Sequence, residues 1–249
     1  MVFAAMSFWL LVAVLAAWGV HRLWSGMLKP RTVNSILLPG TLVAQLGHVA
    51  GLLVTGATVT NTTLYKDDES GEPEMTQDPK PRIPIVGPIV IGMLPLVACV
   101  VGIFLAVRFL GSTIVTAVGG LTVSEVIPTT LGGFWQLLRD QITLTESTLN
   151  AALQANWQQW QVWLFVYLVI CLTVRMAPFP GTLRGSLAAT VVLGLAAALI
   201  ASLTRSDTAT LEPVWPVLTL CVATLTFLLL ASLLVRGGVE LVKLLASNK

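Results

Sequence analysis

The chain has 249 residues, of which 55% are hydrophobic and only 10% are charged. Soluble globular proteins carry a charge on roughly a quarter of their residues, so this composition predicts a protein that lives in the lipid bilayer and argues against a secreted enzyme. Its 14 basic and 12 acidic residues give a net charge of +2. No cluster of Lys and Arg provides the basic surface that nucleic-acid binding requires, so we expect no nucleic-acid partner.

Apolar runs that meet or approach the length of a membrane-spanning helix, about 20 residues, follow one another along the chain. They cover residues 3–24, 36–59, 83–110, 160–176, 187–203 and 214–235. No Lys or Arg precedes the first run and its Ala-rich part lies in the middle, which favours a retained anchor over a signal peptide. The sequence predicts an all-α polytopic membrane protein with about six hydrophobic helices, which form one membrane domain over residues 1–249.

The segments between these runs differ in character. Residues 1–31 comprise the N-terminal anchor and a basic loop, and residues 160–249 comprise the C-terminal helices. Residues 60–82 form an acidic loop that must lie in water, because each carboxylate at the bilayer centre would cost about 2.5 to 3.5 kcal/mol. The strand-like residues 57–60 that lead into this loop predict a short ribbon.

Residues 111–159 are predicted to form an interfacial segment. From residue 134 to 160, apolar side chains recur near every third or fourth position. This spacing predicts an amphipathic helix pair at the membrane surface. Trp157 and Trp160, with glutamines between and beside them, are expected to be interfacial anchors.

The basic residues give conflicting signals about orientation. Arg22, Lys29 and Arg31 place the loop after the first run in the cytoplasm, and the same argument applies to Arg175 and to later basic residues. These positions cannot all be cytoplasmic if the chain crosses at every run. Either a segment between residues 33 and 159 is re-entrant or the Gly-rich run 111–120 also crosses. The polar, Gly-rich composition of 36–59 favours re-entry there.

Cysteines and charges inside the runs give no sign of a reactive centre. Cys99, Cys171 and Cys221 each lie within an apolar run, so we interpret them as small hydrophobic residues, and neither as a disulfide nor as a metal set. No Asp, Glu or Lys stands at the centre of a run. This absence argues against a pump or a proton-coupled transporter.

The run 36–59 contains Leu46-Gly47-His48 and ends in Leu53-Val54-Thr55-Gly56-Ala57-Thr58-Val59. It resembles the first metal-binding helix of the site-2-protease-like intramembrane zinc metallopeptidases, in which an apolar run leads into a His-Glu-x-x-His motif. In that family two histidines one helical turn apart hold zinc, and the glutamate is the general base. The resemblance places Ala44 at the first histidine, Gln45 at the glutamate and His48 at the second histidine.

These substitutions remove the chemistry of the family. One imidazole cannot hold a catalytic zinc ion, and a carboxamide cannot accept the proton that a carboxylate accepts. Residues 174–185 resemble the segment that carries the family's aspartate ligand, and there Thr182 stands at the position of the acid. We therefore expect no catalytic residue, no metal ligand and no cofactor, with Ala44, Gln45, His48 and Thr182 as the positions of a degenerate zinc site.

Helix packing can also explain why these residues are present, without descent from a zinc protease. Gly47, Gly51 and Gly56 with Ala50 form a small-residue face that allows close approach of another helix. Gln45 and His48 could then form hydrogen bonds between helices.

Together these patterns predict a non-catalytic, pseudoprotease-like integral membrane subunit that scaffolds or assembles a larger complex. Its expected partners are the lipid bilayer and other membrane subunits, and its expected location is the bacterial inner membrane. Two alternatives remain open. One is an active intramembrane metalloprotease with atypical ligands. The other is a transporter or channel component, with a hydrated cavity lined by Gln45, His48 and loop carboxylates.

Overall fold

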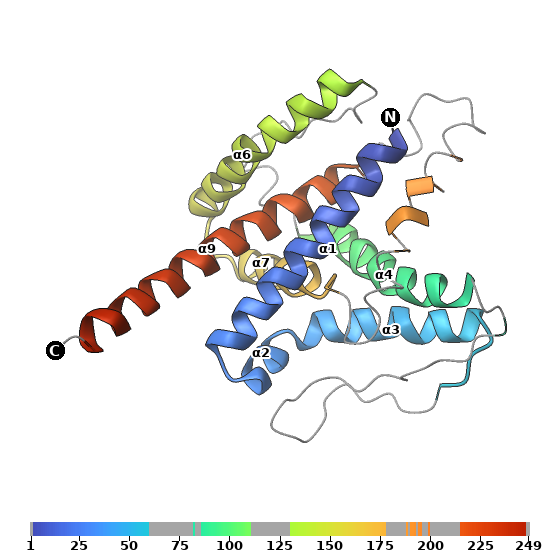
Figure 1. Cartoon of the computed structure of the whole chain (residues 1–249), viewed down its shortest axis with the longest axis horizontal. Coiled ribbons are helices and arrows are strands. Elements are labelled where there is room, and N and C mark those ends of the chain that lie inside the picture. The colour runs from blue at the N-terminus through green and yellow to red at the C-terminus, as the bar shows by residue number, and fades with distance from the viewer. Residues whose placement is uncertain are drawn as a thin grey trace.

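The computed structural model describes residues 2–59, 82, 86–110, 130–177, parts of 188–199, and 215–247. Throughout these residues the regular secondary structure is α-helix, and no strand occurs. Figure 1 shows the helices in chain order: α1 (Val2–Met27), α2 (Pro30–Ile36), α3 (Leu38–Val54), α4 (Val86–Leu110), α6 (Leu131–Gln154), α7 (Trp160–Val174) and α9 (Trp215–Ser247). The predicted all-α class is confirmed for this part of the chain.

Three helices in the described ranges are long and apolar enough to cross a membrane, namely Ser7–Met27 of α1, Val86–Leu110 and Val217–Leu241 of α9. The helices α2 and α3 pass the same test together, but they are bent by 77° and form either a broken span or a re-entrant loop. Helix α7 is apolar but only 15 residues long. The structure therefore has three candidate spans, or four with the bent pair. Six spans are not shown, and most of 187–203 lies outside the described residues.

The bend between α2 and α3 follows from local sequence. Leu37 both ends α2 and precedes α3, and Pro39 stands in the first turn of α3. Proline fits the first turn of a helix because its missing amide hydrogen would have no helical acceptor there, but it cannot extend a preceding helix. The side chain of Thr41 donates a hydrogen bond to the Leu37 carbonyl over 3.0 Å. The bend therefore lies at the start of the second apolar run, and the run itself continues as α3 (Leu38–Val54).

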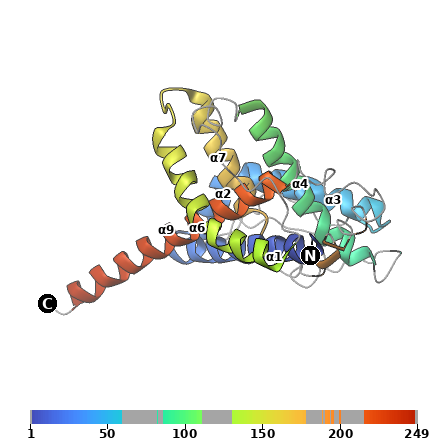
Figure 2. The same ribbon diagram turned by 90° about the horizontal axis from the view of Figure 1, so that it is seen from above.

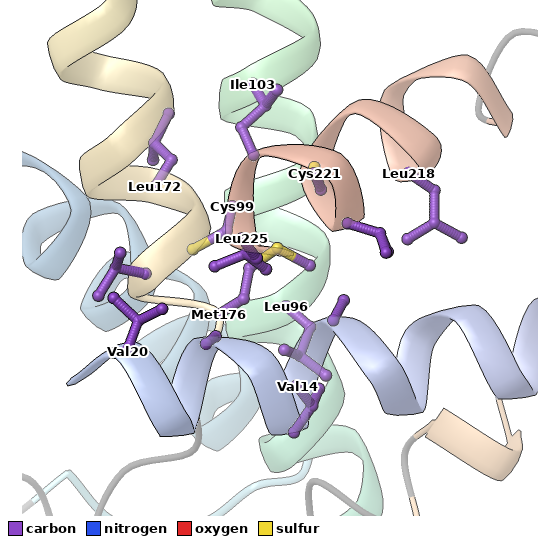
Figure 3. Packing of buried hydrophobic residues seen from close by; sticks show 14 of the residues in the cluster. Val14, Val20, Leu96, Cys99, Ile103, Leu172, Met176, Leu218, Cys221 and Leu225 are labelled. Carbon is purple, nitrogen blue, oxygen red and sulfur yellow. The ribbon is translucent and has the colours of Figure 1, made fainter. Parts of the chain in front are cut away.

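The long helices pack in two groups. Helices α1 and α9 run side by side, whereas α4 crosses them and pairs with α3 and α7 (Figures 1 and 2). A hydrogen bond of 2.8 Å from Trp24 Nε1 to Ser232 Oγ joins α1 to α9. One hydrophobic cluster connects both groups, and Val14, Leu96, Leu172 and Leu225 represent α1, α4, α7 and α9 in it (Figure 3).

Glycines bring the backbones of α3 and α4 together. A Cβ atom on Gly47 would lie 2.6 Å from the Leu94 carbonyl oxygen and 2.8 Å from Pro95 Cα. A Cβ atom on Gly51 would lie 3.0 Å from Ile91 Cα. The predicted helix-packing face is therefore confirmed for Gly47 and Gly51.

The other two members of that predicted face do not belong to it. Ala50 is exposed and therefore does not belong to a buried contact with another helix. Gly56 lies beyond the helix in the left-handed region with φ of 67°, and its surroundings are the side chain of Arg82. A residue with a side chain would be strained in that conformation. Backbone geometry, and not helix packing, therefore accounts for the glycine at this position.

Two local predictions were wrong. Residues 57–59 form no strand, since Ala57 instead donates its amide to the Leu52 carbonyl and closes the end of α3. Within residues 134–160, where a helix pair was predicted, the structure has one continuous helix, α6, which ends at Gln154. Thr130 caps α6 by accepting a hydrogen bond of 3.1 Å from the Gly133 amide, and no proline or glycine interrupts the helix after Gly133.

We predict that Gly47→Ala lowers the free energy of unfolding by about 1–3 kcal/mol, because the added methyl group meets rigid backbone atoms of α4. Thermal unfolding in mild detergent measures the change. Gly26→Ala is the matched control, since nothing lies within 4 Å of its new methyl group. Equal melting temperatures for the two variants would contradict the close α3–α4 contact.

Candidate functional site

Ala44, Gln45 and His48 all face the interior. Ala44 is 0% exposed, Gln45 is 3% exposed and His48 is 1% exposed. Ala44 also belongs to the hydrophobic cluster that includes residues of α1, α4, α7 and α9. The methyl group of Ala44 is therefore a packing element of the central core.

Helix α3 buries two adjacent stripes of different character. With about 100° of rotation per residue, Gly40, Gly47 and Gly51 fall on one stripe, and the second stripe beside it is polar. This polar stripe consists of Thr41, Gln45 and His48, all buried. His48 Nε2 is buried and has no hydrogen-bond partner among the described residues. The polar stripe is the main buried polar feature of a helix with no charged residue.

The residues at the motif positions do not fit a zinc ion. Ala44 has no donor atom, and Gln45 offers a neutral amide where the family has a carboxylate. In the described part of the chain, no three His, Cys, Asp or Glu side chains come together as possible metal ligands. Thr182, the fourth position that sequence analysis predicted for the site, lies outside the described residues.

A second polar group lies where α1, α2 and α7 meet. The guanidinium group of Arg175 donates a hydrogen bond of 2.7 Å to Asn34 Oδ1, and His21 also forms a hydrogen bond with the Asn34 side chain. Arg175 is 6% exposed and Asn34 is 5% exposed. Sequence analysis placed Arg175 in a solvated connection, and the structure corrects this because Arg175 caps α7 and turns into the protein.

Helix α7 also binds the end of α2 through the Ile36 carbonyl. The Tyr167 hydroxyl donates a hydrogen bond of 2.8 Å to this oxygen, and the Cys171 thiol approaches it at 3.3 Å. Gly40, at the start of α3, lets the backbone of α7 come close, because a Cβ atom at this position would overlap the Cys171 carbonyl oxygen. We call Asn34, Ile36, Gly40, Tyr167 and Arg175 the α2–α7 clamp.

The helices that surround this clamp carry no carboxylate. By sequence, α1, α2, α3, α4 and α7 contain neither Asp nor Glu. The carboxylates that the structure describes are Asp140 and Glu146 on α6 and Glu240 on α9, and all three are exposed. An amide oxygen therefore binds the buried guanidinium of Arg175. Burial of an ion is costly without hydrogen bonds, so the hydrogen bond to Asn34 contributes to stability.

The cysteines are free and buried. All three belong to the central hydrophobic cluster, in which Figure 3 shows Cys99 and Cys221 among leucine, isoleucine and methionine side chains. Their surroundings agree with the interpretation as small apolar residues.

Tryptophans gather at the start of α7. The rings of Trp157 and Trp163 meet edge to face with centroids 4.8 Å apart, and Trp163 Nε1 donates a hydrogen bond to the Trp157 carbonyl. Trp160 and Trp163 are 65% and 60% exposed. Exposed tryptophans with a polar neighbour suit the headgroup zone of a bilayer, where one part of the ring is apolar and the other is hydrated.

Comparison with known proteins returns no relative: no family model matches the chain, nor does any curated protein or any solved structure.

We predict that Asn34→Leu destabilises the protein by about 2–3 kcal/mol, because it removes the hydrogen-bond acceptor of a buried charged group. Adding Arg175→Met should recover part of the loss, since the buried ion is then gone as well. Chemical unfolding of the two single variants and the double variant measures this coupling. Strictly additive losses would show that the two side chains do not depend on each other.

Proposed function

We propose that this chain is a non-catalytic integral membrane subunit, built like a site-2-protease-like protein whose zinc site has been lost, that scaffolds or assembles a larger complex of the bacterial inner membrane. The observation that carries the proposal is the burial of Ala44 in the central core, one turn before His48. In the family that the sequence resembles, this position supplies a zinc ligand. Here its side chain fills the protein interior.

The contacts of α3 support the same proposal. Gly47 and Gly51 hold α3 against α4 at backbone distance, so this helix serves as a structural centre for its neighbours. A scaffold requires such fixed helix positions. In this proposal, alanine and glutamine have replaced the histidine and glutamate of a zinc motif. Such a helix no longer binds metal and serves only in packing.

Exposed apolar side chains supply the surface for lipid or for other membrane subunits. Phe104, Leu105 and Phe109 project from α4, and Leu230, Leu233 and Leu234 project from α9. Side chains of this size gain free energy when acyl chains or another apolar helix cover them. The described surface is thus suited to the bilayer and to subunit contacts.

We predict that the protein purified from membranes contains no stoichiometric zinc and that His48→Ala leaves its metal content unchanged. Elemental mass spectrometry measures the metal, and cleavage of a fluorescent transmembrane peptide measures proteolysis. Zinc that is bound at one ion per chain and lost in His48→Ala would refute the non-catalytic proposal. Peptide cleavage that disappears in the same variant would instead support the atypical metalloprotease.

One observation favours a second candidate function, that of a transporter or channel component. The buried polar stripe of α3 lies next to a bend of 77°, and broken helices with polar interior residues form the substrate sites of many transporters. His48 contributes a buried imidazole nitrogen without a hydrogen-bond partner among the described residues. An intramembrane ionisable group of this kind commonly marks an ion or proton path.

Flux measurements decide between the two candidates. For the scaffold, vesicles that contain the protein should conduct cations and protons no faster than protein-free vesicles. For the transporter, wild-type protein should conduct, and His48→Leu should reduce the flux by at least about 10-fold, because the ionisable group is lost. Thr226→Val on α9 is a suitable control, since it removes a hydroxyl from a distant helix.

A further inference from the structure

Helix α6 exposes a stripe in which two charges stand among large apolar side chains. Positions that are alternately four and three residues apart stay on one side of a helix. On α6 these positions are Trp135, Arg139, Ile142, Glu146, Leu149 and Leu153, and all six are exposed. We call these residues the α6 stripe. Ile142, near its centre, is 76% exposed, so its apolar side chain faces away from the rest of the chain.

A different side of α6 contacts the protein. Helix α6 packs against α9, and Gln141 and Thr145 on α6 are partly buried. With about 100° of rotation per residue, Gln141 lies about a quarter of a turn from Ile142. The packing of α6 within the chain therefore leaves the α6 stripe open to another molecule.

The two charges make the α6 stripe complementary to a second copy of itself. Arg139 and Glu146 are seven residues apart, and Ile142 lies between them. When two copies of α6 lie antiparallel about a two-fold axis near Ile142, Arg139 of each copy faces Glu146 of the other. Trp135 of each copy then lies beside Leu149 of the other. Parallel copies would instead place like charges side by side, which is unfavourable.

The same charges disfavour lipid as the occupant of the α6 stripe. A helix that inserts into the surface of a bilayer keeps its charged side chains on the face away from the acyl chains. Arg139 and Glu146 are on the same side of α6 as the exposed apolar residues. Insertion of this side into lipid would therefore bury two charges that do not face each other, whereas a second copy pairs both.

The membrane adds a condition on how the two copies are related. Copies with the same orientation in a membrane are related by an axis along the membrane normal. Such an axis makes two helices antiparallel only when these helices lie along the membrane surface. Helix α6 has 24 residues but is not among the candidate spans of the described ranges. Its expected position at the membrane surface therefore allows the antiparallel pair.

From these features we propose that the α6 stripe binds a second copy of this chain as an antiparallel helix pair with its two-fold axis near Ile142. Contacts of Trp135, Ile142 and Leu149 bury apolar surface and drive the association. The pairs of Arg139 with Glu146 set the direction and the register of the two helices. The inference concerns self-association and does not depend on the scaffold or the transporter function.

Charge reversal in the full chain tests the pairing. Sedimentation in mild detergent measures the dissociation constant of the dimer. Arg139→Glu and Glu146→Arg should each raise this constant at least about 10-fold, because each creates two repulsive contacts. The double variant Arg139→Glu/Glu146→Arg restores both attractive pairs and should return it close to the wild-type value. Asp140→Arg is the matched control, since Asp140 is exposed on the side of α6 away from the stripe and should leave the constant unchanged.

Cysteine cross-linking in liposomes tests the direction of the pair. Ile142→Cys should form a disulfide between two copies, because this position lies near the axis. Leu153→Cys should not, since the two copies of this position would lie about 30 Å apart along the antiparallel helices. The native cysteines of the described residues are buried, so they provide little background.

Several results would overturn the proposal. A monomeric wild-type protein excludes the pair, and if Ile142→Cys is then also shielded from a water-soluble thiol reagent in liposomes, lipid covers the α6 stripe instead. Failure of the double variant to recover, or an equal loss in Asp140→Arg, would show that the charges do not pair. Equal cross-linking of Ile142→Cys and Leu153→Cys would indicate parallel helices. None of these outcomes changes the zinc result, so the two proposals fail separately.

Discussion

The carbonyl oxygen of Ile36 must find hydrogen-bond donors outside its own helix, and the arrangement of the surrounding helices depends on that requirement. In hydrocarbon an unsatisfied backbone group costs several kcal/mol, so a helix can break inside a membrane only where protein or water supplies the missing partner. Tyr167 and Cys171 of α7 supply it here. The same turns of α7 also contact Gly40 and end at Arg175, whose guanidinium group donates a hydrogen bond to Asn34 of α2.

The cost of leaving polar groups unsatisfied in lipid also explains why α3 buries two stripes with different roles. Its glycine stripe allows α4 and α7 to approach at backbone distance, whereas its polar stripe cannot face lipid without cost and is buried. Ala44 lies between the two stripes and fits the tight core. A histidine at this position would have to displace neighbouring side chains, so a small side chain suits this place in the core.

Hydropathy and residue size predicted much of the fold. The runs 3–24, 83–110 and 214–235 correspond to α1, α4 and α9, because a long apolar stretch has few alternatives to a buried helix. The contact of Gly47 with α4 was also predictable, since small residues in apolar helices mark close approach. The C-terminal end of α9 was not predictable, because its last turns are too polar to continue an apolar run.

The candidate site was much harder to predict than the helices. Asn34 and Arg175 are 141 positions apart, and neither has a local pattern that indicates a partner. A lone arginine after an apolar run has the same sequence signal whether it reaches water or turns inward. Sequence analysis did predict that Ala44, Gln45 and His48 lie on one helix, which is α3. It could not show that all three are buried, because burial depends on α4 and α7.

The last helix is longer than the membrane that it would cross. At 1.5 Å per residue, the 33 residues of α9 extend about 50 Å, whereas a bilayer with its headgroups measures about 40–45 Å. Its C-terminal end stands clear of the other helices (Figures 1 and 2). The exposed pair Gly237-Gly238 lies near the base of this protruding rod and weakens the helix there. These two glycines lie near the C-terminal end of the candidate span Val217–Leu241 and lower the helix propensity there by about 1 kcal/mol each.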